Sequence, residues 1–362
     1  MILSNPSIEQ LVAELTPDSF HLLLVGEHAS IDINELIARC DQKQVRIAGG
    51  IFPGIVSPEG KLDAAVIHRK FDFRTKCRIY KDIHLAVEID FEDVAEGSKS
   101  ALLFLDGLSE NISGFLSNTY AYFWNRIRFI GGGCGSISLK QQPCIFSNEG
   151  FFENAAMMLF MENPVSIGVK HGWKQISGPY VVSAAEGNTI HEINWRPAFD
   201  VYKEVIKENK GQSINKENFF DIAKAFPFGI FKEGTEDIVR DPILTDEKSM
   251  TCVGEITNHS VVNILNGNNN DLIEGAREAA AEALASDNIE DILVIDCISR
   301  ALFQEDNFHQ ETGIIMDMIN SKNLSIPLEG VLSLGEISSY GDGYLEFFNK
   351  TIVVGAFLEH ER

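Results

Sequence analysis

The chain has 362 residues, of which 44% are hydrophobic and 23% charged, and its 53 acidic against 30 basic side chains give a net charge of −23. This composition is typical of a folded globular protein, and the length favours two domains over one. The negative charge repels phosphate backbones and anionic lipid headgroups, so we expect no nucleic acid and no membrane surface among the partners of the whole protein.

The sequence lacks the features of a membrane or secreted protein. It has no run of 18 or more apolar residues, and its start, Met1 to Pro6, has neither the basic nor the apolar region of a signal peptide. The six cysteines are scattered without a Cys-x-x-Cys pair, which in a reducing compartment favours buried thiols over disulfides. We therefore expect a cytoplasmic protein.

Three short apolar segments, at residues 22–25, 102–105 and 292–295, are predicted strands that recur along the chain. Each leads into a turn that ends in Ser, then a helical pattern, and then a second apolar segment that enters a Gly-rich sequence. Such units favour parallel pairing with right-handed crossovers, and the β-rich stretches after the second and third units are typical of antiparallel hairpins. We predict a two-domain α/β protein of duplicated strand–helix–strand units, with mixed sheets and antiparallel hairpins.

The predicted domain boundary lies in a polar segment near the middle of the chain. Residues 207–213 are polar, contain a glycine, and separate a predicted helix start at 195–202 from the pair Phe219 and Phe220. We therefore place the first domain at residues 1–212 and the second at residues 213–362.

Two blocks of motifs follow one another along the chain. The first has Leu-Asp-Gly-Leu-Ser at 105–109, Gly-Gly-Gly-Cys-Gly at 131–135, His-Gly-Trp at 171–173 and Pro-Ala-Phe-Asp-Val-Tyr at 197–202. The second has Cys-x-x-Arg at 297–300, a helix through Glu311, Gly-x-x-x-x-Gly-Glu-Ile at 330–337 and Asn-x-Thr at 349–351. This order resembles the N-terminal and C-terminal halves of FIST domains, the sensory modules of prokaryotic signal transduction.

The second block supplies our main candidate ligand site, at places where predicted strands end and turns begin. Arg300 is suited to hold a carboxylate through two parallel hydrogen bonds, Glu336 to hold an amine, and Asn349 to donate and accept. An amino acid displays both charges, and the resemblance to FIST domains also implies an amino-acid-like ligand. The alternative for Arg300 is a structural salt bridge to Glu311.

Cys297, Asp106 and Gly133 complete the candidate ligand-binding set. The tract around Gly133 is interpreted either as a turn whose N–H groups bind an anion or as a close strand crossing without room for a Cβ. Cys297 beside Arg300 is alternatively the nucleophile of a hydrolase or transferase, but no histidine near it in sequence supplies a base. We expect no enzymatic activity.

The nine histidines form no motif typical of a zinc site. A haem needs only one axial imidazole in an apolar pocket, and some FIST-like proteins are haem-based nitric oxide sensors. His171, which follows an apolar strand at 165–170 and precedes Trp173 after one glycine, is our candidate haem ligand. A strand-end histidine satisfied by the protein is the alternative, and no cofactor is required by the remaining sequence.

The chain contains no kinase, receiver, cyclase or DNA-binding motif, so a sensor of this kind signals by contact with a partner such as a histidine kinase or a cyclic-dinucleotide enzyme. The sequence therefore predicts an intracellular sensory protein that binds an amino-acid-like small molecule and acts through a partner signalling protein. The two alternatives are a haem-based nitric oxide sensor and a Cys-dependent hydrolase or transferase.

Overall fold

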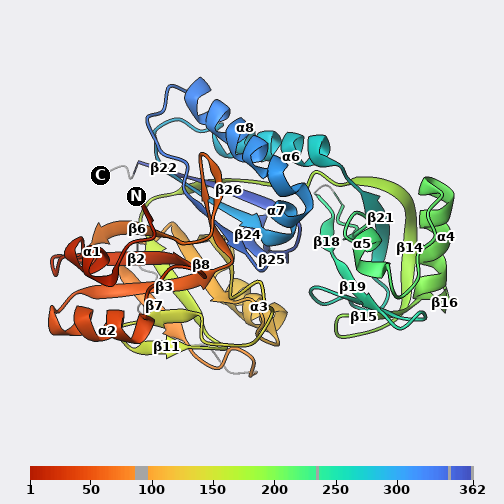
Figure 1. Cartoon of the computed structure of the whole chain (residues 1–362), viewed down its shortest axis with the longest axis horizontal. Helices are drawn as coiled ribbons and strands as arrows, with labels where there is room; N and C mark the ends of the chain where they lie inside the picture. The colour runs from red at the N-terminus through yellow and green to blue at the C-terminus, as the bar shows by residue number, and fades with distance from the viewer. Residues whose placement is uncertain (86–96, 234–235, 341–343, 360–362) are drawn as a thin grey trace.

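The computed structural model describes residues 1–85, 97–233, 236–340 and 344–359. It consists of two parts (Figure 1): a large body, and a small lobe formed by residues 174–266. The small lobe is inserted between β13 (Val165–Lys170) and α6 (Asn269–Ala283), which both belong to the body. Helices and mixed sheets occur together, so the predicted α/β class is confirmed.

Within the described residues, the body repeats one unit of strand, helix, strand, hairpin and strand three times. The first unit is β2 (Ser19–Gly26), α2 (Ile33–Gln42), β3 (Arg46–Phe52), the hairpin β4 (Gly54–Ser57) and β5 (Gly60–Leu62), and β6 (Ala65–Asp72). The second is β8 (Ser100–Asp106), α3 (Ile112–Phe123), β9 (Arg128–Cys134), β10 (Ile145–Ser147), β11 (Gly150–Phe152) and β12 (Ala156–Met161). The third is β22 (Ile289–Cys297), α7 (Ile298–Gln304), α8 (Phe308–Ser321), β23 (Gly330–Ser333), β24 (Glu336–Tyr340), β25 (Tyr344–Phe348) and β26 (Ile352–Leu358).

Each unit pairs its strands in the same way. The strands on either side of the helix are parallel, as the sequence predicts. The last strand runs antiparallel to the first strand of its own unit. The sequence therefore identifies the three repeated units correctly, including the parallel pairs at their centres.

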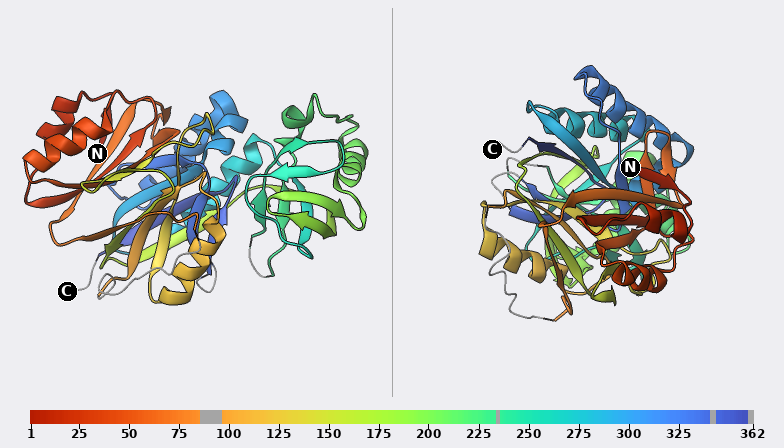
Figure 2. Two further views of the ribbon diagram at one scale, coloured as in Figure 1. Left: turned by 90° about the horizontal axis from the view of Figure 1, so that it is seen from below. Right: turned by 90° about the vertical axis from the view of Figure 1, so that its left-hand side faces the viewer.

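The hairpins are exchanged between units in a cyclic pattern. The hairpin of the first unit pairs with β23 of the third, that of the second pairs with β3 of the first, and that of the third pairs with β9 of the second. Segments from the start and the end of the chain accordingly lie together in the body, with the small lobe to one side (Figure 2, left). Each edge strand precedes a unit in the chain and pairs with the last strand of that unit: β1 (Ile2–Ser4) with β6, β7 (Lys76–Tyr80) with β12, and β13 with β26. The three units therefore form one body that cannot separate without breaking its sheets.

A single apolar core lies where the three sheets face one another. It takes inward side chains from every unit, for example Leu24, Phe104 and Ile295. The helices cover the outer faces: α2 packs on the first sheet, α3 on the second, and α6 with α8 on the third. In the part of the chain that the structure describes, no helix is long and apolar enough to cross a membrane.

The Gly-rich strand β9 runs through the most crowded part of this core. A Cβ on Gly131 would lie 1.7 Å from the carbonyl oxygen of Leu103, and one on Gly133 would lie 2.8 Å from the Cα of Gly107. Neither space can be opened by moving a flexible side chain, because both neighbours are backbone atoms. The tract therefore packs against neighbouring backbone without room for a Cβ, which agrees with the structural alternative for Gly133 in that respect.

The small lobe has its own core. Its strands are β14 (Lys174–Glu186), β15 (Thr189–Ile193), β16 (Arg196–Pro197), β17 (Phe228–Ile230), β18 (Ile238–Arg240), β19 (Pro242–Thr245), β20 (Met250–Cys252) and β21 (Val261–Asn266). Two helices, α4 (Ala198–Lys210) and α5 (Phe219–Ala223), pack into the same apolar cluster. The predicted boundary between residues 212 and 213 falls between these two helices, and so within the chain segment that builds this core.

Candidate functional site

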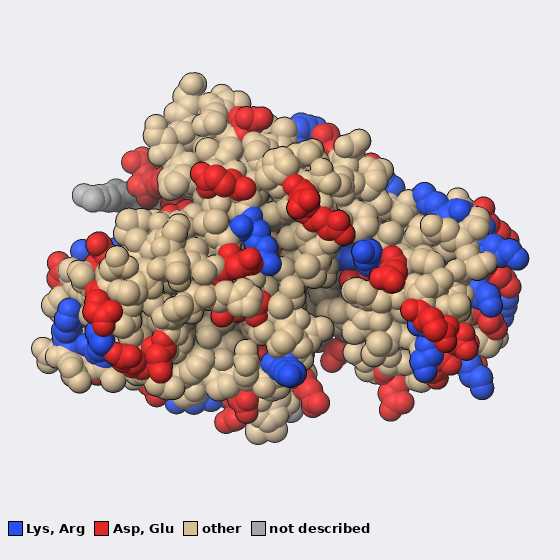
Figure 3. Space-filling model, viewed as in Figure 1, with Lys and Arg blue, Asp and Glu red and all other residues tan. Residues whose placement is uncertain are grey.

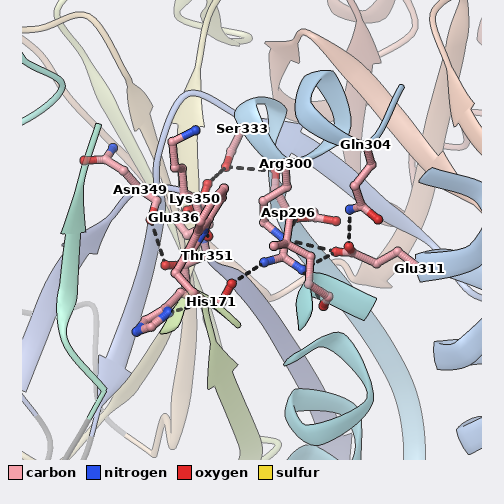
Figure 4. A network of polar contacts seen from close by, with 12 residues as sticks. His171, Asp296, Arg300, Gln304, Glu311, Ser333, Glu336, Asn349, Lys350 and Thr351 are labelled. Atoms are coloured by element: carbon pink, nitrogen blue, oxygen red, sulfur yellow. Dashed lines mark hydrogen bonds and ion pairs between the residues drawn. The ribbon is translucent and has the colours of Figure 1, made fainter. Parts of the chain in front are cut away.

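The four site residues that the sequence predicts in the third unit, Cys297, Arg300, Glu336 and Asn349, lie in one polar cluster where the body meets the small lobe (Figure 4). The cluster takes residues from the ends of β22 and β23, from the first helices after β22, from the start of β24, and from the loop between β25 and β26. All of these residues are buried, so the position and charge of each side chain depend on the protein groups around it. The members of the cluster are Asp296, Cys297, Arg300, Gln304, Glu311, Ser333, Glu336, Asn349, Lys350 and Thr351.

Arg300 lies at the centre of an internal ion network and has no exposed surface. Its Nη2 is 2.6 Å from Glu311 Oε1, and its Nε is 3.1 Å from Asp296 Oδ1. Its Nη1 and Nη2 also donate to the carbonyl oxygens of His171, at 2.7 Å, and Leu272, at 3.1 Å. The structure thus shows the salt bridge to Glu311 that was the alternative for Arg300, and an external carboxylate would have to displace these partners.

Asp296 and Glu311 place two carboxyl groups beside this one guanidinium. Burial raises the pKa of Asp296 well above its usual range, and the neighbouring Glu311 raises it further. Neither oxygen of Asp296 accepts a hydrogen bond from a described residue. Oδ1 lies within ion-pairing distance of Arg300 Nε, but the two groups are not aligned for a hydrogen bond. The group is electrically balanced when Asp296 holds a proton, and Gln304 completes it by donating to Glu311.

Glu336 is also satisfied by the protein. Its carboxyl group accepts hydrogen bonds from Ser333 Oγ at 2.7 Å and from the Thr351 N–H at 3.2 Å. Burial raises the pKa of Glu336 to about 8, while these two hydrogen bonds oppose the rise. Arg300 and Glu336 therefore form the buried framework of the cluster, and the structure does not present them as two open ends of a clamp.

Cys297 stands at the start of α7 and is 3% exposed. Burial raises the pKa of its thiol far above the usual value, and the nearby Glu336 raises it further. The backbone N–H groups of Ser299 and Lys350 face its sulfur. A thiol that stays protonated and buried is a poor nucleophile, so this arrangement gives no support to a Cys-dependent hydrolase or transferase.

Asp106 and Gly133 belong to the second unit and are used within it. Asp106 accepts hydrogen bonds from the N–H groups of Leu108, at 3.1 Å, and Asn154, at 2.7 Å, and from the side chain of Gln141. The N–H of Gly133 donates to the carbonyl oxygen of Gly335 at 2.7 Å. This N–H is therefore engaged by the third unit and does not project into a turn that could hold an anion.

His171 lies at the end of β13 and has both ring nitrogens engaged. Nδ1 accepts a hydrogen bond from the Trp173 N–H at 2.9 Å, and Nε2 lies 3.0 Å from Glu236 Oε2. Burial lowers the pKa of His171 to about 4, so the ring is neutral with its proton on Nε2. Neither nitrogen presents a free lone pair to an iron atom, so a haem does not fit at His171 in this arrangement.

The loop of Asn349, Lys350 and Thr351 connects this cluster to the small lobe. Lys350 is 1% exposed, and its Nζ lies 3.1 Å from Asp241 Oδ2 and donates to the Lys224 carbonyl oxygen at 3.0 Å. The same ammonium lies 5.1 Å from the centre of the Trp173 ring. Space-filling atoms show a hollow between the body and the small lobe (Figure 3). We call the contact region around this loop the junction.

Arg240 of the small lobe reaches the same loop from the other side. Its Nη1 donates to the Phe347 carbonyl oxygen at 3.2 Å and approaches Asn349 Oδ1 at 3.5 Å. Arg240, Asp241 and Lys350 are not among the site residues predicted from the sequence. Lys350 is the middle residue of the Asn-x-Thr motif, but the meeting of the three side chains depends on how the small lobe packs on the body.

Two family models match successive parts of the chain. The model of the FIST N domain matches residues 22–196, and the model of the FIST C domain matches residues 198–339. The two matches meet at β16, inside the small lobe, so both contribute to that lobe and to the body. No curated protein is similar enough to this chain to count as a match.

Proposed function

The chain belongs to the FIST family, whose domains are sensory modules of signal transduction that bind small ligands, and we propose that it senses an amino-acid-like molecule at the junction. In this proposal the protein works inside the cell and passes the signal to a partner, such as a histidine kinase or a cyclic-dinucleotide enzyme. It acts by binding and not by catalysis.

The observation that carries the proposal is the position of the 349–351 loop. One side of this loop contacts the buried cluster of the third unit, because the Thr351 N–H donates to Glu336. The other side contacts the small lobe through Lys350 and Asp241. A ligand that binds beside the loop therefore acts on both parts of the molecule at once.

The junction has the chemistry that a zwitterion requires. Lys350 supplies a cation, Asp241 supplies a carboxylate, and Asn349 supplies an amide that both donates and accepts. Oδ1 of Asp241 is buried without a hydrogen-bond partner among the described residues, which leaves an acceptor for an ammonium group. In this proposal Arg300 and Glu336 position the loop and do not touch the ligand.

Signalling follows when the ligand binds one arrangement of the lobes better than another. Its effect on that equilibrium is limited to its differential affinity for the two arrangements. The contacts that change are those between Lys350 and Asp241 and between Arg240 and Phe347, because these join the small lobe to the body. A partner protein that reads the relative position of the lobes would receive the signal.

A thermal-shift screen of the standard amino acids and related small acids tests this proposal. We expect at least one compound to raise the melting temperature of the wild type. Its binding free energy for Lys350→Met should be weaker by about 2 to 5 kcal/mol, because this change leaves Asp241 unpaired. The matched control is Lys232→Met, which removes an exposed ion pair to Glu346 between the same two parts.

Two results would count against the proposal. The absence of any stabilising compound in the screen would exclude an amino-acid-like ligand. A compound that binds Lys350→Met and Asn349→Ala as tightly as the wild type would place the ligand site away from the junction.

A further inference from the structure

Arg240, at the end of β18, is a buried cation without a carboxylate partner. It is 7% exposed. Its Nε donates to the Glu255 carbonyl oxygen at 2.9 Å, and its Nη1 donates to the carbonyl oxygens of Val239, at 3.0 Å, and Phe347, at 3.2 Å. Within the described residues no carboxylate forms an ion pair with it, since Glu346 and Asp241 pair with Lys232 and Lys350 instead.

The other buried arginines of the described chain are paired. Arg300 lies between Glu311 and Asp296, and Arg69 lies between Asp291 and Glu329. This is the usual arrangement, because burying a charge without a counter-charge is costly. Arg240 departs from it at the junction, which the proposed function identifies as the place of the ligand.

Arg240 lacks a counter-charge in direct contact. Arg240 and Lys350 are both buried at the junction, and Asp241 is the buried carboxylate that lies within ion-pairing distance of Lys350. The carboxylates of Glu346 and Glu255 act on Arg240 from beyond ion-pairing distance. A ligand carboxylate at Arg240 would supply the direct counter-charge that these groups do not supply.

The guanidinium of Arg240 has one free edge. Its Nη2 donates to no described residue, and it is not among the buried polar atoms that lack a partner, so it retains contact with the outside. Gly254, at φ +83°, packs over the same group: a Cβ there would lie 3.0 Å from Nε and 3.2 Å from Cζ of Arg240. The absence of a side chain at this position therefore lets the backbone pack closely against the guanidinium without displacing it.

We propose that Arg240 binds the carboxylate group of the sensed molecule, through the free Nη2 edge of its guanidinium. This assignment of ligand class rests on the proposed function for its biological meaning. The side chain of Asn349, which already approaches Nη1 of Arg240, lies beside the bound carboxylate. Because Arg240 also holds the Phe347 carbonyl oxygen of the body, the ligand would bind at a residue that joins the two parts.

Acetate is the probe that tests this site in the intact protein. Nitrogen-15 NMR of the arginine Nε–H groups should show a saturable shift of the Arg240 signal with acetate, and no such shift with chloride or methylamine at equal ionic strength. The signal is assigned by its loss in Arg240→Gln. In that variant we expect acetate affinity to fall about tenfold or more, because a charged hydrogen bond is lost.

Arg196→Gln is the matched control, because Arg196 lies in the same lobe but is half-exposed and paired with Glu204. It should bind acetate as the wild type does. Where Arg240→Gln does not fold, Arg240→Lys serves instead, since it keeps the charge but lacks the Nη2 group and should show a smaller loss. The absence of a saturable acetate shift at Arg240 in the wild type overturns the proposal whatever the variants do.

The outcomes also separate this inference from the proposed function. An amino acid that binds Arg240→Gln as tightly as the wild type overturns the role of Arg240 and leaves the sensory proposal standing. Acetate bound at Arg240, in a protein that no amino acid stabilises, supports the carboxylate site and contradicts the amino-acid-like ligand.

Discussion

In the second unit the strand that leads into the helix ends at Asp106, and in the third unit it ends at Cys297. The two residues occupy the same place, because each is the last residue in its parallel register and each donates its N–H across to the final strand segment of its unit. The side chains also face equivalent groups. Asp106 accepts from the N–H groups of Leu108 and Asn154, and the sulfur of Cys297 faces those of Ser299 and Lys350.

The neighbouring positions of the two turns differ in charge. Leu105 of the second unit corresponds to Asp296 of the third, and Ser109 corresponds to Arg300. The same backbone turn is thus built once around an apolar residue and a hydroxyl, and once around an ion pair. The fold requires only a group that faces the two N–H groups, so the ionic cluster is a property of the third unit, which contacts the small lobe.

The largest expected effect comes from removing the cation of the third turn. Arg300→Met leaves the buried Glu311 carboxylate without its counter-charge and removes the neighbour of Asp296, and we expect it to lower the free energy of unfolding by about 3 to 5 kcal/mol. Ser109→Ala, the equivalent change in the second turn, should cost about 1 kcal/mol, since it removes a hydroxyl that bonds Asn154. Urea unfolding of both variants measures the difference, and equal losses would refute the contrast between the turns.

Glu336 gives the third unit a distinct pH dependence. Its pKa is raised to about 8 in the folded protein, against about 4.5 in the unfolded chain, so the folded state binds the proton more tightly. The stability that Glu336 contributes is therefore complete below about pH 4.5 and is lost as the pH rises through about 8. We expect this loss to be on the order of a few kcal/mol and to be absent in Glu336→Gln. The free energy of unfolding of the wild type and of Glu336→Gln is measured at pH 6 and at pH 9, at about 25 °C. If both proteins lose the same free energy between these pH values, Glu336 is not the source of the pH dependence.

A smaller difference is expected at the strand ends themselves. Asp106→Ala leaves two partly buried N–H groups without an acceptor and should cost about 2 kcal/mol. Cys297→Ala removes a weaker acceptor and should cost about 1 kcal/mol. Thermal unfolding of the two variants orders them. If Cys297→Ala lost more stability than Asp106→Ala, the thiol would have to make a stronger contact than the acceptor contact with the two N–H groups.

The smallest expected effect is chemical. Because Cys297 is buried and burial raises the pKa of its thiol, iodoacetamide should label it slowly near neutral pH. Mass spectrometry of the peptide that contains residue 297 follows the reaction, with urea-unfolded protein as the positive control. Rapid labelling of the folded protein, together with turnover of a ligand, would instead favour the Cys-dependent enzyme.

The sequence predicts the repeated units because their signals are local. Apolar strands such as residues 102–105, the turns after them, and the Gly-rich second strands are all visible within a short window. The exchange of hairpins is not visible there, because β4 pairs with β23 at the far end of the chain, and several strands would accept such a partner equally well by pattern alone.

The candidate site also has one part that the sequence predicts and one part that depends on contacts between distant segments. The sequence places Arg300 and Glu336 at strand ends and offers Glu311 as a salt-bridge partner, which the structure shows. It cannot tell a free histidine at the end of an apolar strand from a satisfied one, because the partner of His171, Glu236, lies in the small lobe. Arg240 was not predicted as a site residue for the same reason, since its lack of an ion-pair partner exists only in the folded molecule.

Hydrogen exchange of the backbone amides, measured with and without the amino acid that the screen identifies, tests the central claim most directly. If the junction is the sensory site, exchange slows in residues 347–351 of the body and in residues 238–241 of the small lobe, while the turn at residues 106–109 is unchanged. Protection that is confined to the second turn, or that leaves both junction segments unaffected, would contradict a sensory site at the junction.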